Sequence, residues 1–408
     1  MNKNIKLAVA GAVLALSASA ANAGIVIPAG DWTMDINGNV NGYATFSKSK
    51  GATAINGAVA TAQQAHQDNN QTLNTGLLPA WLGFTGKTRQ NDLDVEFTIS
   101  LQPGISANDV SGDGAFAGTG SKMLNRQTYL SFGDKSWGSI KIGKDLGVFA
   151  ADAILSDMTL LGVGSGVAAS GAATNTTNGG IGTGYIYAAW KGQIAYTTPN
   201  FNGFQATVAL TNPDQFQPSA TQGTLTGMTV AQDRFGLEGK ASYSFSGDTA
   251  NGKLWVSGAS YDVTTSTTSG SYTASVADMG LNVNAGNVGL TGYYYRGDGV
   301  GTTLLGYYGA TTAGQKRDSD GGYIQGTYVL PTKTKIGLAY GVSKLDAANA
   351  TDAAANLIKE NNRLTLGVYH PITKHLNLVA EYNDIESKSH NSLNVKQETG
   401  SLGAILFF

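Results

Sequence analysis

Polar and apolar residues alternate along several stretches of the chain with a period of two. Over residues 234–245 the even-numbered positions are mostly polar, as at Glu238, and the odd-numbered positions are mostly apolar, as at Leu237. The same alternation occurs over residues 94–101 and 335–343. Successive side chains of a β-strand point to opposite faces of its sheet, so each stretch predicts a strand with one polar and one apolar face.

Short and long connections alternate between the predicted strands. The short ones are rich in Gly, Pro, Asn and Asp, which reverse the chain with little strain. They are expected at residues 89–92, 133–138, 200–203, 247–252, 286–287, 331–333 and 371–375. The long ones are expected at residues 47–79, 102–124, 145–184, 212–232, 263–275, 296–321, 345–361 and 386–394. Seven short and eight long connections predict about sixteen strands.

The difference between the two kinds of connection favours a membrane barrel over a soluble sandwich, which would also show the alternation. Segments of about ten residues suit strands that cross ~25 Å of hydrocarbon, and bacterial outer-membrane barrels have an even number of strands with short turns on one side. We therefore expect an all-β fold, a closed antiparallel transmembrane β-barrel of about 16 strands. Short turns are expected in the periplasm and long loops outside the cell, around a water-filled interior.

The first 23 residues have the features of a secretory signal peptide. Lys3 and Lys6 precede an apolar run over residues 7–16, and Ala21-Asn22-Ala23 forms a small-residue cleavage site. We expect residues 1–23 to be removed on export and residues 24–408 to form one barrel domain. Loss of the two lysines changes the formal charge from −2 to −4. Elsewhere no apolar run reaches the ~18 residues of a membrane-spanning helix.

The composition argues against several other classes of protein. The formal charge of −2 offers no basic excess for nucleic acid, so we expect no nucleic-acid partner. The absence of cysteine excludes thiolate metal sites and thiol catalysis. We expect neither a cofactor nor a metal site.

Aromatic residues fall near the ends of the predicted strands. They are Trp137, Tyr293, Tyr294, Tyr295, Tyr323, Tyr328, Tyr340, Tyr382, Phe407 and Phe408. Amphipathic rings favour the boundary between lipid and water, so these residues are expected to form belts around the barrel.

Three stretches resemble motifs of the general-diffusion porins of Gram-negative outer membranes. Residues 82–86 read LGFTG after the first long loop, where the family has L-G-F-x-G. Residues 125–129 read NRQTY and lead to GSIKIGK at 138–144, where the family has an arginine-led strand, a turn and G-x-x-x-x-G-R. Residues 402–408 resemble the terminal strand, whose closing phenylalanine, here Phe408, serves the family as an assembly signal.

This resemblance implies a function, an assembly and a location. Porins of this family are sixteen-stranded homotrimers in the outer membrane, and small hydrophilic solutes and ions diffuse through them passively. We therefore expect a water-filled channel with no covalent step and no cofactor. The expected partners are further copies of the chain, outer-membrane lipid and lipopolysaccharide. The first strand and early loops are expected to support the contact between subunits.

The resemblance also identifies residues 145–184 as the third extracellular loop, which in the family folds into the lumen and sets its narrowest point. Its acids Asp152 and Asp157 are expected to face bases on the wall, because opposed charges in a narrow passage create a strong transverse field. By the family's pattern, Arg126 and Lys144 occupy such wall positions. Alternation alone adds a second set of inward bases: Lys87, Lys141, Lys191, Arg234 and Lys240.

The sequence departs from the enterobacterial porins in this region. Trp81 precedes the LGF motif where an arginine is frequent, and Lys144 replaces the usual arginine. The loop also lacks the P-E-F-G-G of that group. Inward acids are expected at Glu96, Glu238 and Glu381, so a preference for cations or anions does not follow from the net charge.

A substrate-specific channel is the nearest alternative function. Sugar-specific barrels use a ladder of aromatic residues along the lumen, and phosphate-selective barrels use a ladder of bases. Here the inward bases are few and mixed with acids, and we expect no regular aromatic ladder in the inward register. The pattern therefore favours a general pore.

An outer-membrane barrel enzyme is the second alternative. Such enzymes need a Ser or Asp beside an oriented His. The chain has four histidines, with His66 and His390 in predicted outer loops and His370 and His375 beside a predicted turn. A wide aqueous bore is poorly suited to a site that excludes water, so we expect no enzyme activity.

Two short motif matches are expected to carry no function. Arg296-Gly297-Asp298 matches an adhesion tripeptide, but these residue types are common in any loop. Asp318, Asp320 and Gly321 resemble a fragment of a calcium loop without its distant glutamate.

Overall fold

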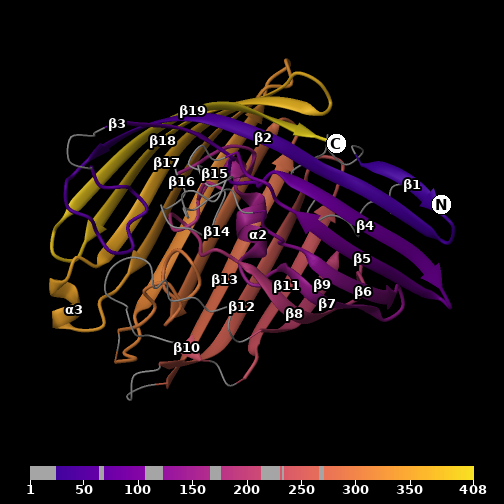
Figure 1. Cartoon of the computed structure of the whole chain (residues 1–408), viewed down its shortest axis with the longest axis horizontal. Coiled ribbons are helices and arrows are strands. Elements are labelled where there is room, and N and C mark those ends of the chain that lie inside the picture. The colour runs from indigo at the N-terminus through magenta and orange to yellow at the C-terminus, as the bar shows by residue number, and fades with distance from the viewer. Residues whose placement is uncertain are drawn as a thin grey trace, which may run out of the picture.

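The computed structural model describes residues 24–63, 69–105, 123–165, 176–212, 230–231, 234–265, 271–311 and 313–408. Within these residues, nineteen strands form one antiparallel sheet (Figure 1). Sixteen of them form the wall of a closed barrel. The wall strands are β2 (Trp32–Lys50), β4 (Trp81–Gln90), β5 (Leu93–Leu101), β6 (Thr128–Asp134), β7 (Gly138–Leu146), β8 (Trp190–Thr197), β9 (Phe204–Thr211), β11 (Gly236–Ser246), β12 (Asn251–Thr265), β13 (Ser271–Ala285), β14 (Val288–Asp298), β15 (Asp318–Val329), β16 (Lys335–Leu345), β17 (Ile358–Pro371), β18 (Leu376–Ser389) and β19 (Asn394–Phe407).

Three short strands extend the wall at its margins. β1 (Ile25–Ala29) pairs with the start of β2, β3 (Asn69–Asn74) with the end of β2, and β10 (Val230–Ala231) with the end of β12. The described helices are α2 (Ala151–Ser156), the 3₁₀-helix η2 (Met158–Leu161) and α3 (Ala350–Ala354). No helix of the described ranges is long and apolar enough to cross a membrane.

The barrel closes between its first and last wall strands. β19 pairs with β2 in one register, from Phe407 opposite Asn39 to Lys396 opposite Lys50. The Phe407 amide also donates to the His375 carbonyl in the connection between β17 and β18, at 2.9 Å. The C-terminus therefore lies at the end of the barrel that carries the short turns. The all-β barrel predicted from the alternation is confirmed.

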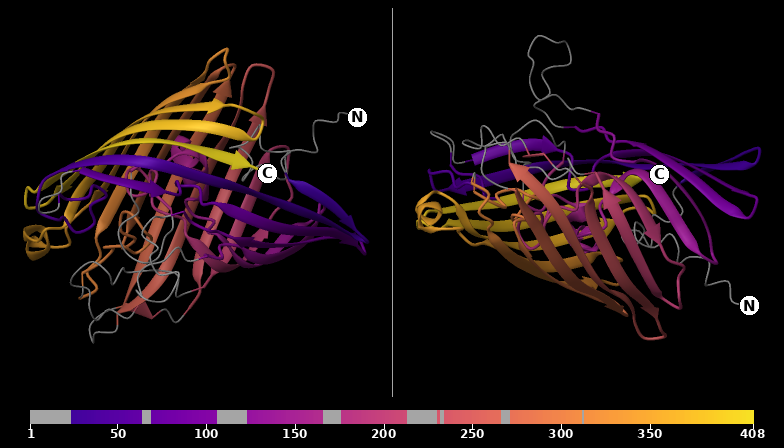
Figure 2. Two further views of the ribbon diagram at one scale, coloured as in Figure 1. Left: turned by 45° about the horizontal axis from the view of Figure 1, so that its top comes forward. Right: turned by 90° about the horizontal axis from the view of Figure 1, so that it is seen from below.

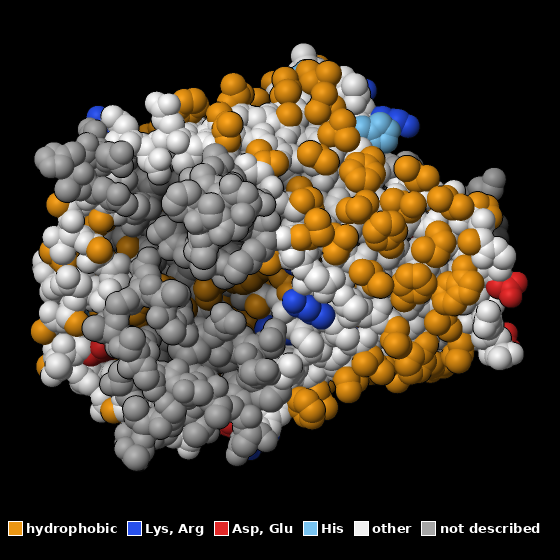
Figure 3. Space-filling model, viewed as in Figure 1, with side chains coloured by type: hydrophobic (Ala, Val, Ile, Leu, Met, Phe, Trp, Pro, Cys, Tyr) orange, Lys and Arg blue, Asp and Glu red, His pale blue; other side chains and the backbone are white. Residues whose placement is uncertain are grey.

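The two faces of the wall are divided as the period of two predicts. On β11, the Leu237 side chain is 50% exposed whereas its neighbour Glu238 is fully buried. On β5, Thr98 and Ser100 are buried, whereas Ile99 between them is exposed on the outer face. Figure 3 shows a broad band of apolar side chains at the right of the molecule, where β2 and β4–β6 lie. A surface of this kind suits hydrocarbon rather than water.

The seven predicted short connections all join adjacent strands in the structure. Two of the predicted long connections are wrong. The 263–275 segment belongs largely to β12 and β13, which pair as far as Thr264 opposite Ser271, and only residues 390–393 separate β18 from β19. Residues 263–275 are mostly serine and threonine and residues 386–394 are mostly polar or charged, so these strand ends resembled loops. The strands nevertheless continue beyond the apolar band, because the ladder itself satisfies their backbone groups.

The aromatic belt is only partly correct. Tyr294, Tyr328, Tyr340, Tyr382 and Trp137 are exposed on the outer surface. In contrast, Tyr293, Tyr295 and Tyr323 are buried on the inner face. Position near a strand end predicted a belt for all of them, but the register of the strand decides which face each ring occupies.

The segment between β7 and β8 runs inside the ring of strands. It carries α2 and η2, and both views of Figure 2, like Figure 1, place its magenta ribbon within the barrel. Its residues Phe149, Ile154 and Leu160 are buried in one apolar cluster with inward side chains of the wall, such as Trp255 and Tyr293. We call the described parts of this segment, residues 147–165 and 176–189, the inner segment.

Candidate functional site

The inner segment is bound to the wall by two glutamates with the same arrangement of contacts. On β11, the Glu238 Oε2 atom accepts the amides of Val148 at 2.7 Å and Phe149 at 2.9 Å. Its Oε1 atom accepts the Tyr261 hydroxyl at 2.6 Å and forms an ion pair with Lys191. Both charged side chains are fully buried.

On β18, Glu381 repeats this pattern further along the segment. Its Oε2 atom accepts the amides of Val163 at 2.9 Å and Gly164 at 2.8 Å, and its Oε1 atom accepts the Tyr369 hydroxyl at 2.7 Å. β11 and β18 are seven strands apart in the sixteen-strand ring. The inner segment therefore crosses the lumen from one side of the wall to nearly the opposite side.

Neutral side chains of the wall also hold the inner segment in place. Gln325 accepts the Met158 amide at 2.7 Å, and Ser343 accepts the Gly184 amide at 2.8 Å. Tyrosine hydroxyls donate in the other direction, from Tyr323 to the Ala153 carbonyl at 2.8 Å and from Tyr43 to the Leu161 carbonyl at 2.7 Å. Buried backbone groups of a loop need partners of this kind, because no helix or ladder satisfies them.

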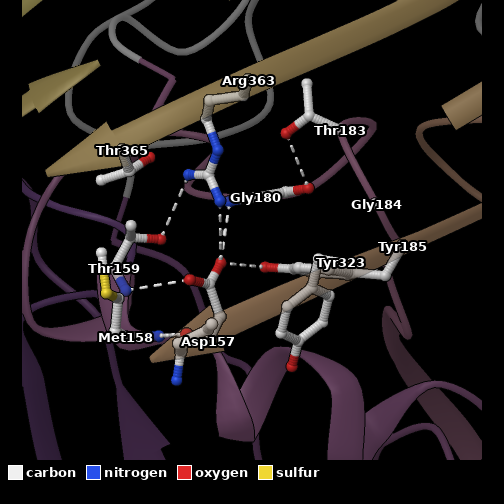
Figure 4. A network of polar contacts seen from close by, with 12 residues as sticks. Asp157, Met158, Thr159, Gly180, Thr183, Gly184, Tyr185, Tyr323, Arg363 and Thr365 are labelled. Atoms are coloured by element: carbon white, nitrogen blue, oxygen red, sulfur yellow. Dashed lines mark hydrogen bonds and ion pairs between the residues drawn. The ribbon is translucent and has the colours of Figure 1, made fainter. Parts of the chain in front are cut away.

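Asp157 lies within a buried polar network (Figure 4). Its Oδ1 atom accepts the Thr159 amide, and its Oδ2 atom accepts the Gly180 amide and the Tyr185 hydroxyl, each at 2.9 Å. The guanidinium of Arg363, from β17, lies 3.8 Å from the carboxylate. Burial raises the pKa of Tyr185 well above its usual value, and the Asp157 carboxylate raises it further. Asp157 thus joins two parts of the inner segment and is shielded from solvent.

Asp152, in the first turn of α2, contacts two bases of the wall. Its carboxylate lies 2.8 Å from the Lys240 ammonium and also pairs with Lys253. Burial alone would raise the pKa of Asp152, but the ammonium groups of Lys240 and Lys253 outweigh it, so this pKa lies below its usual range. Both lysines keep part of their surface exposed. This contact brings one acid of the segment against two bases of the wall.

A second group of predicted residues lies on β4–β7 and the segment before β6. Lys141 pairs with Asp145 and lies over the Tyr129 ring, 4.7 Å from its centroid. Lys87 pairs with Glu96 at 3.3 Å. The Lys144 ammonium donates to the Asn125 carbonyl at 2.8 Å, and Arg126 is buried, with its backbone amide on Gln102. Lys87 and Lys141 share the inner face with Glu96 and Asp145. Lys144 instead lies opposite Thr128 and Gly192, on the face of the exposed Ile142, so the prediction of an inward Lys144 is not supported by the register.

Arg234 does not follow the prediction from alternation. Its side chain is 71% exposed and pairs with Asp262. Asp262 lies between the buried Tyr261 and Val263, so it points outward from β12. β11 begins only at Gly236, and the alternation of the strand therefore does not extend to Arg234.

Sequence reasoning missed several residues of the site. Lys253 was hidden beside a predicted turn, although the inward register of β12, with Trp255 and Ser257, includes it. Sequence reasoning also missed a group of aromatic side chains that are buried on the inner face: Trp255, Tyr261, Tyr293, Tyr295 and Tyr323. The inner segment covers these rings, which gives them a packing role.

The histidines and the short motifs have ordinary structural surroundings. His370 contacts the Thr334 hydroxyl and His390 the Leu345 carbonyl, each at 2.8 Å, while His66 lies outside the described residues. Asp318, Asp320 and Arg296 lie in strands rather than in loops. Within the residues that the structure covers, no group of three or more His, Asp or Glu side chains could hold a metal ion.

A closed β-barrel with polar residues inside, apolar residues outside and a segment across its lumen defines a membrane channel. The family model of the Gram-negative porins matches residues 9–390, and the chain belongs to this family. It is an outer-membrane β-barrel protein that forms a channel for passive diffusion. No curated protein sequence matches the chain.

Solved structures of outer-membrane channels share the fold. The channel DcaP of Acinetobacter baumannii is 15% identical, with a TM-score of 0.68 over 95% of this chain and 100% of its own. An anion-selective porin from Comamonas acidovorans is 14% identical, with a TM-score of 0.60 over 92% and 100%. The trimer form of OmpT of Vibrio cholerae is 13% identical, with a TM-score of 0.53 over 92% and 99%.

Proposed function

We propose that small hydrophilic solutes and ions pass beside the inner segment, which sets the narrowest section of the channel. The observation that supports this proposal is the pair of glutamates, Glu238 and Glu381, that fix the segment across the lumen. A loop held at two distant points of the wall by buried, charge-assisted hydrogen bonds keeps a constant position and therefore a constant opening.

The charges at this section act as an electrostatic filter. Asp152 faces Lys240 and Lys253, while Lys87, Arg126 and Lys141 lie on β4, β7 and the approach to β6, interspersed with Glu96 and Asp145. Charges of both signs across a narrow passage create a transverse field that selects solutes by charge as well as by size. Asp157, buried against Arg363, serves the shape of the segment and does not act on passing ions.

Single-channel recording in planar bilayers tests this function. We expect stepwise, ohmic conductance with no saturation by any one solute. A protein that inserts and gives no conductance steps would refute the channel. Block by one sugar or anion at low concentration would favour the substrate-specific alternative instead.

The barrel acts without a covalent step. His370 contacts a threonine hydroxyl and His390 a backbone carbonyl, which is not the arrangement of an activated nucleophile. Lipase or protease activity of the purified protein that disappears on changing His66 or His390 would overturn this part of the proposal.

The mature protein begins at Gly24 and assembles as a homotrimer among outer-membrane lipids and lipopolysaccharide. The trimer form of OmpT and the shared fold support the oligomer, and the features of residues 1–23 support cleavage. N-terminal sequencing of the exported protein should start at Gly24. Gel mobility before and after boiling should show one oligomeric species that converts to monomer; a monomer in both samples would exclude the trimer.

A further inference from the structure

Three segments without charge meet at the end of the barrel that carries the long connections. Residues 51–62, which follow β2, and residues 299–311, which follow β14, pack against residues 176–189 of the inner segment. None of the three segments contains a charged residue or a histidine. The Ile55 side chain is buried in one apolar cluster with Tyr308. We call these three segments the mouth layer.

The segments of the mouth layer are in close contact with one another. A Cβ added at Gly182 would lie 2.7 Å from the Thr303 hydroxyl oxygen and 2.9 Å from a Val59 methyl carbon. The Tyr187 amide donates to the Thr303 carbonyl at 2.9 Å. A side chain at residue 182 would therefore push the segments apart, because close-packed atoms leave no space for it.

Neutral side chains of the wall hold residues 51–62 in this position. Side-chain oxygen atoms of Asn361 on β17, Ser387 on β18 and Gln397 on β19 accept the backbone amides of residues 59–61, at 2.8–3.0 Å. All three wall side chains are buried. The wall thus satisfies the amides of an inward loop without adding a charge.

The mouth layer and the opposed charges lie at different depths of the channel. On β18, Ser387 is six residues nearer the long connections than Glu381, which holds the inner segment. At ~3.3 Å per residue, the two contacts are about 20 Å apart along the strand. Asp152 meets Lys240 and Lys253 toward the short turns, since Lys253 lies near the start of β12. We call this level the charged section.

We propose that the mouth layer is a second filter of the channel, which slows bulky solutes of any charge before they reach the charged section. An uncharged lining with neutral anchors exerts no net field on an ion, so the width of the passage decides entry there. Uncharged oligosaccharides are the class of solute that this layer limits most. The proposal rests on the proposed function, because it assumes that solutes cross the barrel.

Liposome swelling with uncharged sugars tests this proposal. In the loop variant, residues 54–62 are replaced by an equal number of Gly and Ser residues, which form a flexible chain without the apolar contacts. The control carries Gly or Ser at residues 350, 351, 353 and 354 of α3, whose residues are all partly or fully exposed at the same end of the barrel. The entry rates of a trisaccharide and a monosaccharide are compared, and reversal potentials in a KCl gradient measure the ion preference.

We expect the loop variant to raise the entry rate of the trisaccharide, relative to the monosaccharide, roughly threefold, because a fixed lining gives way to a mobile chain. Its ion preference should stay that of the wild type, and the control should match the wild type in both measurements. An unchanged ratio of sugar rates, or an equal rise in the control, would overturn the proposal. Loss of the oligomer on gels before boiling would also overturn it, because residues 51–62 would then serve the contact between subunits.

Cysteine labelling tests the position of the mouth layer independently of transport. The chain has no cysteine, so Ala60→Cys and Thr53→Cys each introduce a single thiol. Ala60 is buried, whereas Thr53 is exposed. A maleimide should label T53C in the folded barrel at once and A60C only after boiling. Equal labelling would show that residues 51–62 do not fold inward, whereas a wild type without conductance would refute the channel and leave the labelling result unchanged.

Discussion

At the scale of single residues, two buried carboxylates position the inner segment. Glu238 and Glu381 each use one oxygen for two successive backbone amides and the other for a tyrosine hydroxyl. Only Glu238 also has an ammonium partner, Lys191, within 4 Å in the described part of the chain. Glu381 depends on hydrogen bonds alone at that distance, so its side of the segment should respond more sharply to a change.

Replacing Glu381 by alanine should loosen the segment at β18. We expect the free energy of unfolding to fall by about 2 kcal/mol, because a carboxylate that accepts several hydrogen bonds is lost and two buried amides lose their partner. Open-channel current noise should increase at the same time. Urea unfolding and single-channel recording measure the two effects.

The matched control is Glu398→Ala, which removes an exposed glutamate 3.8 Å from Lys50 on the outer face. It should change stability by less than about 0.5 kcal/mol and leave the current noise unchanged. Quiet, wild-type-like currents in the Glu381 variant would show that this glutamate does not hold the segment.

Asp152 sets the balance of charge beside Lys240 and Lys253. In Asp152→Asn both bases lose their counter-charge, and we expect the preference for anions over cations to rise roughly fivefold, as a unit charge ~4 Å away in water is worth about 1 kcal/mol. Reversal potentials in a KCl gradient measure this preference. Asp384→Asn, on the outer face, loses the same charge and should not change it.

The lowered pKa of Asp152 gives this contact a defined pH dependence. Because the folded-state pKa lies below the ordinary value of about 3.9, the contribution of the contact to stability is complete above about pH 4 and is lost as the pH falls through the lowered pKa. The wild type should therefore keep its ion preference from neutral pH to about pH 5 and approach the Asp152→Asn variant only in stronger acid. A change in preference at pH 6 would contradict this assignment.

At the scale of elements, the wall is made of hairpins joined by tight turns. The turn between β13 and β14 consists of Gly286 and Asn287 alone. Gly286 has a φ of +55°, and a Cβ added at this residue would have no atom within 4 Å. Its conformation, rather than its space, is what requires glycine.

Gly286→Ala should therefore destabilise the hairpin by about 1 kcal/mol through backbone strain alone. Gly292→Ala, on β14, is the matched control, since a Cβ there would also have no atom within 4 Å but the residue has no positive φ. Urea unfolding in lipid should separate the two variants. Equal stabilities would mean that the turn can adopt another conformation without cost.

Alternation and turn composition predict most of these elements, because the lipid and the lumen impose opposite demands on successive residues. The same logic fails where polar residues dominate a strand end. The ends of β12 and β13 and of β18 and β19 are rich in polar residues and were predicted as loops, although their inward residues, such as Val263 and Val395, are buried. Alternation identified Lys240, and the family resemblance identified Asp152. Neither predicts the hydrogen bonds of Glu381, since contacts of a loop with a distant strand leave no periodic signal in the sequence.

At the scale of the whole molecule, the barrel depends on the closure of β19 against β2. Beyond the last paired residue, the backbone of Phe408 exchanges two hydrogen bonds with Gly38, at 2.8 and 3.0 Å. The backbone of the last residue therefore has a role in closure that is separate from any recognition of its ring during assembly.

Two variants separate these roles. Phe408→Ala keeps both backbone hydrogen bonds, so it should refold in detergent as the wild type does while giving less trimer in cells. Deletion of Phe408 removes the two bonds and should also reduce the yield of refolded barrel. Gel mobility before and after boiling measures both. Normal assembly of Phe408→Ala in cells would exclude the aromatic ring as the signal.

The pairing of β19 with β2 also fixes an order of events during synthesis. The strand that leaves the ribosome first must wait, with one edge unsatisfied, for the strand that leaves it last. A chain that terminates early keeps two open edges and has no shorter ring to adopt. A late frameshift that removes β19 should therefore prevent closure of the barrel as completely as an early one.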